Sequence, residues 1–210
     1  MIYINKGKEP CELTTFNANR KGKNINWNDD SQIPPNLKPA IKRSLNVEQY
    51  GRCAYCTREI GDDCQIEHYI PRATNLKLTW DYNNMLGVDN SVAMPQKYKN
   101  TCENGRGSKA LHINPRDMGD MSGIYYSRDG RIKHDRYQDE LDNVLSLNKD
   151  VYVNHRKNLL ARLECTLKCM KKNGITINLN EIRKEYIDNN IVKPLCQIVL
   201  WFIDNRKLIY

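Results

Sequence analysis

The sequence contains no long apolar run. Its longest one covers six residues, from Ile198 to Ile203, whereas a membrane-spanning helix needs about 20, so we exclude an integral membrane protein. The residues from Met1 to Lys6 lack the apolar stretch of a secretory signal. The chain also has no internal repeat, no low-complexity segment and no Walker-type phosphate-binding loop. We therefore expect a cytoplasmic protein without nucleotide-dependent control of its own.

Cysteine, in contrast, is plentiful, with eight residues among 210. Because no secretion signal is present, we expect no disulfide framework, and paired cysteines in a reducing compartment more often bind a metal ion. Cys53 and Cys56 are separated by two residues, a spacing that lets two thiolates supply half of a tetrahedral zinc site. Only single cysteines, Cys64 and Cys102, follow in the next fifty or so residues. The alternative interpretation is two small buried side chains beside a turn.

The net charge is positive, and the excess lies outside the cysteine-rich middle. The chain carries 33 basic and 25 acidic side chains, a net charge of +8. The basic and acidic side chains number 8 and 5 in residues 1–50, 9 and 8 in 51–117, and 16 and 12 in 118–210. Acidic metal ligands surrounded by groups that attract phosphate would give this distribution, and so would an ordinary solvated surface.

Residue patterning predicts an α+β fold with three regions. Residues 1–50 predict an extended arm, with one short strand at Met1–Ile4, and a lead-in helix over Lys38–Tyr50. Residues 51–117 are rich in turn residues, which indicates short strands and loops with one short helix near the end.

The region 118–210 is predicted to be mainly helical. Asp129-Gly130 indicates the turn of a β-hairpin. Apolar residues at helical spacing then predict helices over Tyr137–Leu147, Leu159–Met170 and Asn180–Asn190. A last helix over Leu195–Ile203 is apolar nearly all round, which is typical of a buried helix.

A carboxylate and an imidazole stand side by side in Glu67-His68, among β-favouring residues. A glutamate oxygen can hold Mg²⁺ or Mn²⁺, and a neutral imidazole can take a proton from water. On a regular strand the two side chains point to opposite faces, so only a bulge or a strand end would let both serve one site. Alone, the dipeptide is also compatible with an ordinary surface histidine.

Four motifs follow one another in order and together resemble a known family. They are Cys53-x₂-Cys56, Glu67-His68-x₂-Pro71, Tyr82-x-Asn84-Met85-Leu86 and Cys102-Glu103-x₂-Arg106-Gly107. This series resembles the HNH endonucleases of the ββα-metal fold. The knuckle Arg52–Cys56, the Glu-His form and the segment Ile113–Asp117 are most similar to the PtuB type. These proteins are paired with an ABC-type ATPase in Septu and retron-associated antiphage systems.

The resemblance implies a role for each matching residue. His68 would be the general base, and Asn84, or its neighbour Asn83, would orient it. Glu67 and Glu103, with Asn104 as the alternative to the latter, would bind the catalytic Mg²⁺ or Mn²⁺. The residues expected to contact nucleic acid are Arg106, Arg72 and Lys109.

The resemblance also implies a structural zinc ion with an incomplete ligand set. Cys53, Cys56 and Cys102 match three of its ligands, and the third-cysteine position of the family falls near Asp89 in this chain. The fourth ligand remains open between Asp89, Cys64 and a water molecule, and loss of the zinc is a further alternative. His112, nine residues after Glu103, is an alternative ligand at the catalytic site.

The resemblance thus implies an HNH nuclease core at 51–117, between an N-terminal arm with a lead-in helix at 1–50 and a helical region at 118–210. The expected activity is metal-dependent hydrolysis of phosphodiester bonds, with DNA favoured and RNA such as tRNA left open. The expected role is that of a toxic antiviral effector with a PtuA-like ABC-type ATPase, and in some systems with a retron reverse transcriptase and its DNA–RNA product. The alternative function is a non-catalytic, zinc-ribbon-like adaptor that binds nucleic acid or the ATPase.

Overall fold

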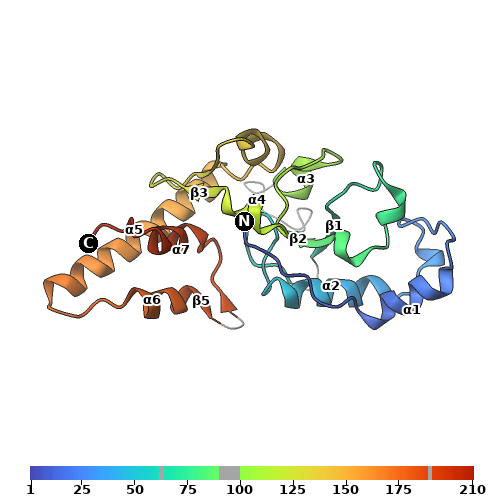
Figure 1. Ribbon diagram of the computed structural model, residues 1–210, viewed down its shortest axis with the longest axis horizontal. Coiled ribbons are helices and arrows are strands. Elements are labelled where there is room, and N and C mark those ends of the chain that lie inside the picture. The colour runs from blue at the N-terminus through green and yellow to red at the C-terminus, as the bar shows by residue number, and fades with distance from the viewer. Residues whose placement is uncertain (62–63, 90–99, 189–190) are drawn as a thin grey trace.

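The computed structural model describes residues 1–61, 64–89, 100–188 and 191–210, and it confirms an α+β fold. In this part of the chain the strands pair into small two-stranded antiparallel sheets. The N-terminal helices lie at one end of the molecule and the C-terminal helices at the other (Figure 1). No helix in these ranges combines the length and the apolar character needed to cross a bilayer.

The N-terminal region is more helical than its polar sequence indicates. It contains α1 (Cys11–Arg20), the 3₁₀ turn η1 (Asp30–Gln32) and α2 (Leu37–Glu48). The prediction of α2 is confirmed, but the extended arm is wrong in part, because α1 interrupts it and residues 1–4 form no strand. Leu13 and Phe16, one helical turn apart, are buried in a cluster with Leu37, Ile41 and Trp80, and this packing stabilises a helix of weak intrinsic amphipathicity.

The central region is built on one short hairpin-like pair of strands. Strand β1 (Gln65–His68) pairs antiparallel with β2 (Met85–Val88), so that His68 lies opposite Met85. Between them run the 3₁₀ turns η2 (Leu76–Leu78) and η3 (Tyr82–Asn84), and after them come α3 (Glu103–Arg106) and α4 (Met118–Ser122). A side chain at Gly87 would meet Ile60 and Gln49 at 3.1 and 3.2 Å, so glycine lets β2 pack closely on α2.

The C-terminal region follows the predicted pattern in most of its elements. The hairpin is confirmed as β3 (Ile124–Tyr126) and β4 (Ile132–His134), and the long helix as α5 (Asp150–Lys172). The helix predicted over Tyr137–Leu147 is only a π-helical turn, η6 (Glu140–Val144). The one predicted over Asn180–Asn190 is α6 (Leu179–Tyr186), which ends early because the chain continues into β5 (Ile187–Asp188) and β6 (Ile191–Val192). The final helix is α7 (Gln197–Asp204).

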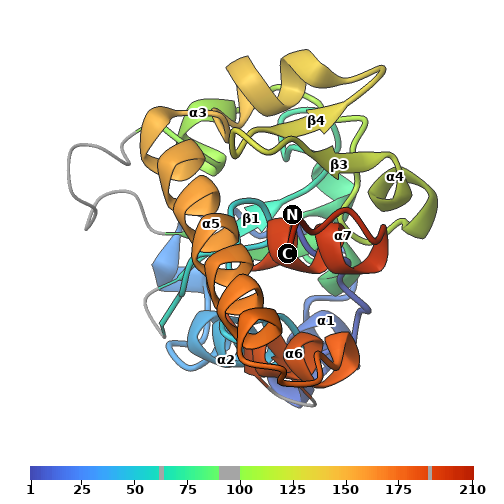
Figure 2. The same cartoon turned by 90° about the vertical axis from the view of Figure 1, so that its left-hand side faces the viewer.

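One large hydrophobic core joins the ends of the chain to its middle. It contains Met1 and Ile4, the cysteine knuckle, and apolar residues of β3, α5 and α7. Helix α7 is buried there beside α5, α6 and β3 (Figure 2), as its apolar sequence predicts. Polar contacts support this packing: Thr57 donates to the Gln197 side chain at 2.7 Å, and Arg52 donates to the carbonyl of Val192.

Candidate functional site

His68 is the last residue of β1, and its side chain is held in one orientation. The imidazole is buried, with 6% of the residue exposed. Its Nε2 lies 2.9 Å from the carbonyl oxygen of Thr79. Because a carbonyl oxygen can only accept a hydrogen bond, Nε2 carries the proton and Nδ1 is left with a lone pair.

The surroundings of His68 keep it neutral. Burial is the main cause that lowers its pKa to about 4; the hydrogen bond to Thr79 opposes this shift, and the charge of Arg72 adds to it. The ring of Trp27 contacts the imidazole edge-on, with 4.7 Å between ring centroids. At neutral pH, His68 is therefore an acceptor for a proton at Nδ1.

Asn84 fixes the loop that carries the partner of His68. Its Oδ1 accepts from the backbone N–H of Ile70 at 2.8 Å, and its Nδ2 donates to the carbonyls of Ile70 and Leu78 at 3.0 and 3.3 Å. Leu78 directly precedes Thr79, so Asn84 positions the carbonyl that binds His68. The neighbouring Asn83 is exposed, and of the two alternatives only Asn84 is built into this arrangement.

Glu67 points to a different set of partners from His68. Its carboxylate forms a buried ion pair with Arg106 and accepts from the hydroxyl of Tyr55 at 3.2 Å. Arg106 also donates to that hydroxyl at 3.0 Å and to the carbonyl of Lys109 at 2.8 Å. The prediction that Arg106 contacts nucleic acid is wrong, because its side chain is 0% exposed and its guanidinium neutralises Glu67.

Removing this guanidinium should cost stability rather than phosphate affinity. Arg106→Ala removes one partner of the buried Arg106–Glu67 ion pair, and removing one partner of such a pair typically destabilises a protein by about 3–5 kcal/mol. Urea unfolding of the variant would measure this change in the free energy of unfolding. Arg131→Ala is the matched control, since its pair with Asp129 is 45% and 58% exposed and should be worth less than about 1 kcal/mol. Equal, small losses in both variants would contradict a buried pair.

A polar groove of about 710 Å³ opens beside His68 and Glu67. Its basic lining comes from Lys38 and Lys42 of α2 and from Arg72, which follows β1. Gly107 and Ser108, just after α3, also line the groove. Lys109, which is predicted to contact nucleic acid, follows them on the same loop and is exposed. The groove therefore combines a neutral imidazole with cationic side chains, which suits an anionic substrate.

The structure describes one of the carboxylates predicted to bind a catalytic cation, Glu67. Among the described residues Glu67 is the one carboxylate that lines the groove, and Arg106 already compensates its charge. Glu103 begins α3, but its side chain and that of Asn104 lie outside what the structure describes. The described donors thus do not by themselves form a site for Mg²⁺ or Mn²⁺, which needs several oxygen ligands.

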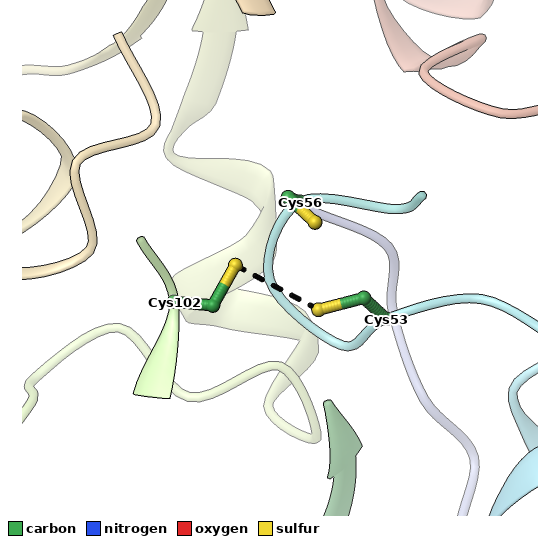
Figure 3. A group of neighbouring side chains, drawn as sticks. All are labelled: Cys53, Cys56 and Cys102. Carbon is green, nitrogen blue, oxygen red and sulfur yellow. Dashed lines mark hydrogen bonds between the residues drawn. The ribbon is translucent and has the colours of Figure 1, made fainter. Parts of the chain in front are cut away.

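A second site, separate from the groove, brings three thiols together. The sulfur atoms of Cys53, Cys56 and Cys102 all lie within 4.8 Å of one another and are buried (Figure 3). Those of Cys53 and Cys102 are 3.8 Å apart. Burial opposes ionisation of Cys53, but hydrogen bonds from Cys102 and Cys56 lower its pKa well below the ordinary value. A thiolate held by two thiols is a ligand set that could bind a metal such as zinc.

Of the two protein side chains considered for the fourth position, the structure places Asp89 beside these thiols. The Asp89 carboxylate oxygen Oδ2 is 3.9 Å from the Cys56 sulfur and 3.0 Å from the Arg58 guanidinium. Cys64 is buried too but lines the groove instead. Asp89 is therefore the nearer of the two candidates for a fourth ligand, but the group of ligand atoms that all lie within 4.8 Å of one another consists of the three sulfur atoms.

Several residues of the site were not predicted from the sequence. His112, predicted as an alternative ligand, lies outside the site. Lys38 and Lys42 are four residues apart on a helix and so share a face, and this spacing can be recognised in the sequence. Trp27 and Thr79 carry no such signal, because tertiary packing alone brings them to His68. His112 is 68% exposed in its side chain, pairs with Glu140 at 2.6 Å and does not line the groove.

The chain was also compared with known proteins. No protein-family model matches it, and no curated protein is similar enough to count as a relative.

Proposed function

We propose that this chain is a metal-dependent endonuclease of the HNH type, which hydrolyses phosphodiester bonds of nucleic acid. The observation that carries the proposal is the orientation of His68. Its Nε2 is bound to the Thr79 carbonyl and its Nδ1 is left as the proton acceptor, in a groove lined by Lys38, Lys42 and Arg72. The order of β1, β2 and α3 also supports assigning them to a ββα core.

In the proposed reaction, Nδ1 of His68 takes a proton from the water molecule that attacks phosphorus. The bond between that oxygen and phosphorus forms as the bond to the leaving oxygen breaks. The imidazolium that results keeps its Nε2 hydrogen bond to Thr79, so the ring does not have to reorient. The lysine and arginine side chains of the groove bind the phosphate oxygens and oppose the negative charge that grows on them.

The proposal includes a divalent cation, Mg²⁺ or Mn²⁺, with Glu67 and Glu103 as the ligands that the resemblance implies. Bound by these residues, such a cation would supply stabilisation of the negative charge that develops in the reaction. The role proposed for His68 does not depend on how the cation is held.

The proposed activity can be tested with the purified full chain on plasmid DNA, single-stranded DNA and tRNA. We expect cleavage of at least one substrate with Mg²⁺ or Mn²⁺, and loss of cleavage when EDTA removes the cation. DNA is the favoured substrate. A protein that retains nucleic acid in a gel-shift experiment but cleaves none of the three substrates would instead match the non-catalytic adaptor.

We further propose that the nuclease is the toxic effector of an antiphage system. The support for this is the resemblance of residues 52–117 to the PtuB type, together with the lack of a Walker-type loop in the chain. Control would then come from outside, from an ABC-type ATPase and, in retron-associated systems, from a reverse transcriptase with its DNA–RNA product. The buried position of α7 leaves the other surfaces of the flanking regions for such a partner.

A further inference from the structure

Trp27 is the one aromatic residue among the described residues that line the groove, and it comes from outside the four motifs. Its half-buried indole contacts the His68 ring edge-on, and it packs against Trp80 with 4.7 Å between ring centroids. Trp80 belongs to the hydrophobic cluster formed with α1 and α2. The indole is therefore held in place by Trp80 of the hydrophobic cluster, and it lines the groove directly beside His68, the proposed base.

Two cations of the groove lie over the same indole ring. The ammonium of Lys38 is 5.2 Å from the ring centroid and the guanidinium carbon of Arg72 is 5.8 Å from it. Both distances are within the range of cation–π attraction. Two positive charges, Lys38 of α2 and Arg72 of the loop after β1, therefore lie close to Trp27 beside His68.

Each cation is also bonded to an exposed oxygen of the segment that carries Trp27. Lys38 donates to Oδ1 of Asp30 at 2.6 Å, and Arg72 donates to Oδ1 of Asn28 at 3.3 Å. Exposed pairs of this kind are weak, and a phosphate oxygen is an acceptor of the same type with a full negative charge nearby. A phosphodiester can therefore replace Asp30 and Asn28 as the partner of the two cations.

We infer that Trp27, Lys38 and Arg72 form a subsite for a single-stranded segment of nucleic acid, next to His68. The two cations bind one phosphate, and in turning toward it they uncover the indole, on which the adjoining base stacks. Aromatic stacking combined with basic side chains is the usual means of holding an unpaired strand, whereas a duplex does not offer the face of a base. The inference rests on the proposed function for the nature of the ligand.

Binding can be measured without cleavage in a full-chain His68→Asn background, which keeps a planar polar side chain beside Trp27. The probe is a short fluorescein-labelled single-stranded DNA, titrated by anisotropy at several salt concentrations. We expect Trp27→Ala to weaken binding about tenfold at every salt concentration, since stacking contributes that much per base. Lys38→Ala and Arg72→Ala should each lower the slope of log Kd against log salt by about 0.7, as for one lost phosphate contact on a single strand.

The chain offers a matched control in a second tryptophan–lysine pair. Lys207 lies 4.5 Å from the ring centroid of Trp201, so Trp201→Ala and Lys207→Ala remove the same chemistry elsewhere. These variants should keep the affinity and the salt slope of the background. Trp27→Phe, which preserves packing on Trp80, should bind within about threefold of the background and shows that the alanine result is not a folding defect.

Three outcomes would overturn the subsite. They are unchanged affinity in Trp27→Ala, unchanged salt slopes in both Lys38→Ala and Arg72→Ala, or equal losses in the Trp27 and Trp201 variants. Failure of the proposed function is a separate result: a wild-type protein that cleaves nothing would refute the nuclease, while the anisotropy series would still decide whether this subsite binds a single strand.

Discussion

His68→Ala should lower the rate of nucleic-acid cleavage by about 10²–10⁴-fold, the usual contribution of a general base. The loss is expected in kcat, because the imidazole takes a proton only as the water attacks, and the cations that bind phosphate remain. Single-turnover cleavage with enzyme in excess would measure the chemical step directly. Circular dichroism and a thermal melt would show that the variant is folded, which matters because His68 also bonds Thr79.

His112 supplies the matched control for this prediction. Its Nδ1 lies 2.6 Å from Glu140, so it too is an imidazole held by a fixed acceptor, but it does not line the groove. His112→Ala should therefore keep the wild-type cleavage rate. Wild-type cleavage by folded His68→Ala, or an equal loss in both variants, would refute the assignment of His68 as the base.

Cys53→Ser should abolish both metal binding and folding of the chain. A structural zinc ion contributes an apparent binding free energy of about 10–16 kcal/mol in small zinc-finger peptides, which is as large as the whole stability of a typical domain, about 5–15 kcal/mol. We expect purified wild-type protein to contain about one zinc per chain by elemental analysis. The variant should lose the zinc and most of its soluble yield, and Cys56→Ser and Cys102→Ser should behave alike.

The control for the zinc site is Cys165→Ser, since Cys165 is an exposed cysteine of α5. This variant should keep the zinc content, the soluble yield and the melting temperature of the wild type. Absence of zinc from the wild-type protein, together with normal folding of Cys53→Ser, would show that the three thiols are only buried side chains.

The sequence predicts those elements whose own residues determine them. Helices α2 and α5 and the β3–β4 hairpin follow from apolar periodicity and from Asp129-Gly130. Helix α1 could not be predicted, because only Leu13 and Phe16 of its residues are buried and their partners come from α2 and Trp80. The π-helical form of η6 is likewise a result of packing, in which Leu141 and Val144 enter the main core.

The residues of the candidate site are likewise of two kinds: those that a local sequence pattern indicates and those that only tertiary packing brings to the site. Spacing alone indicates Cys53 and Cys56, and motif order adds Cys102, His68 and Asn84. For Arg106 the motif gives the residue type at its position but not the direction of its side chain, and the guanidinium turns inward to form an ion pair with the buried Glu67 carboxylate. Trp27 reaches His68 from 41 positions away, and no local pattern encodes such a contact.

The shared core also determines the order in which the chain can complete its fold during synthesis. Arg52 and Thr57, on either side of the first cysteine pair, bond residues 140 positions later, Val192 and Gln197. A ribosome therefore releases the cysteine pair long before the segment that bonds the residues on either side of it. Contacts so distant in sequence form late in folding. The cysteine-rich middle of the chain consequently remains unfinished until α7 has emerged, so the proposed nuclease activity would arise only after that step.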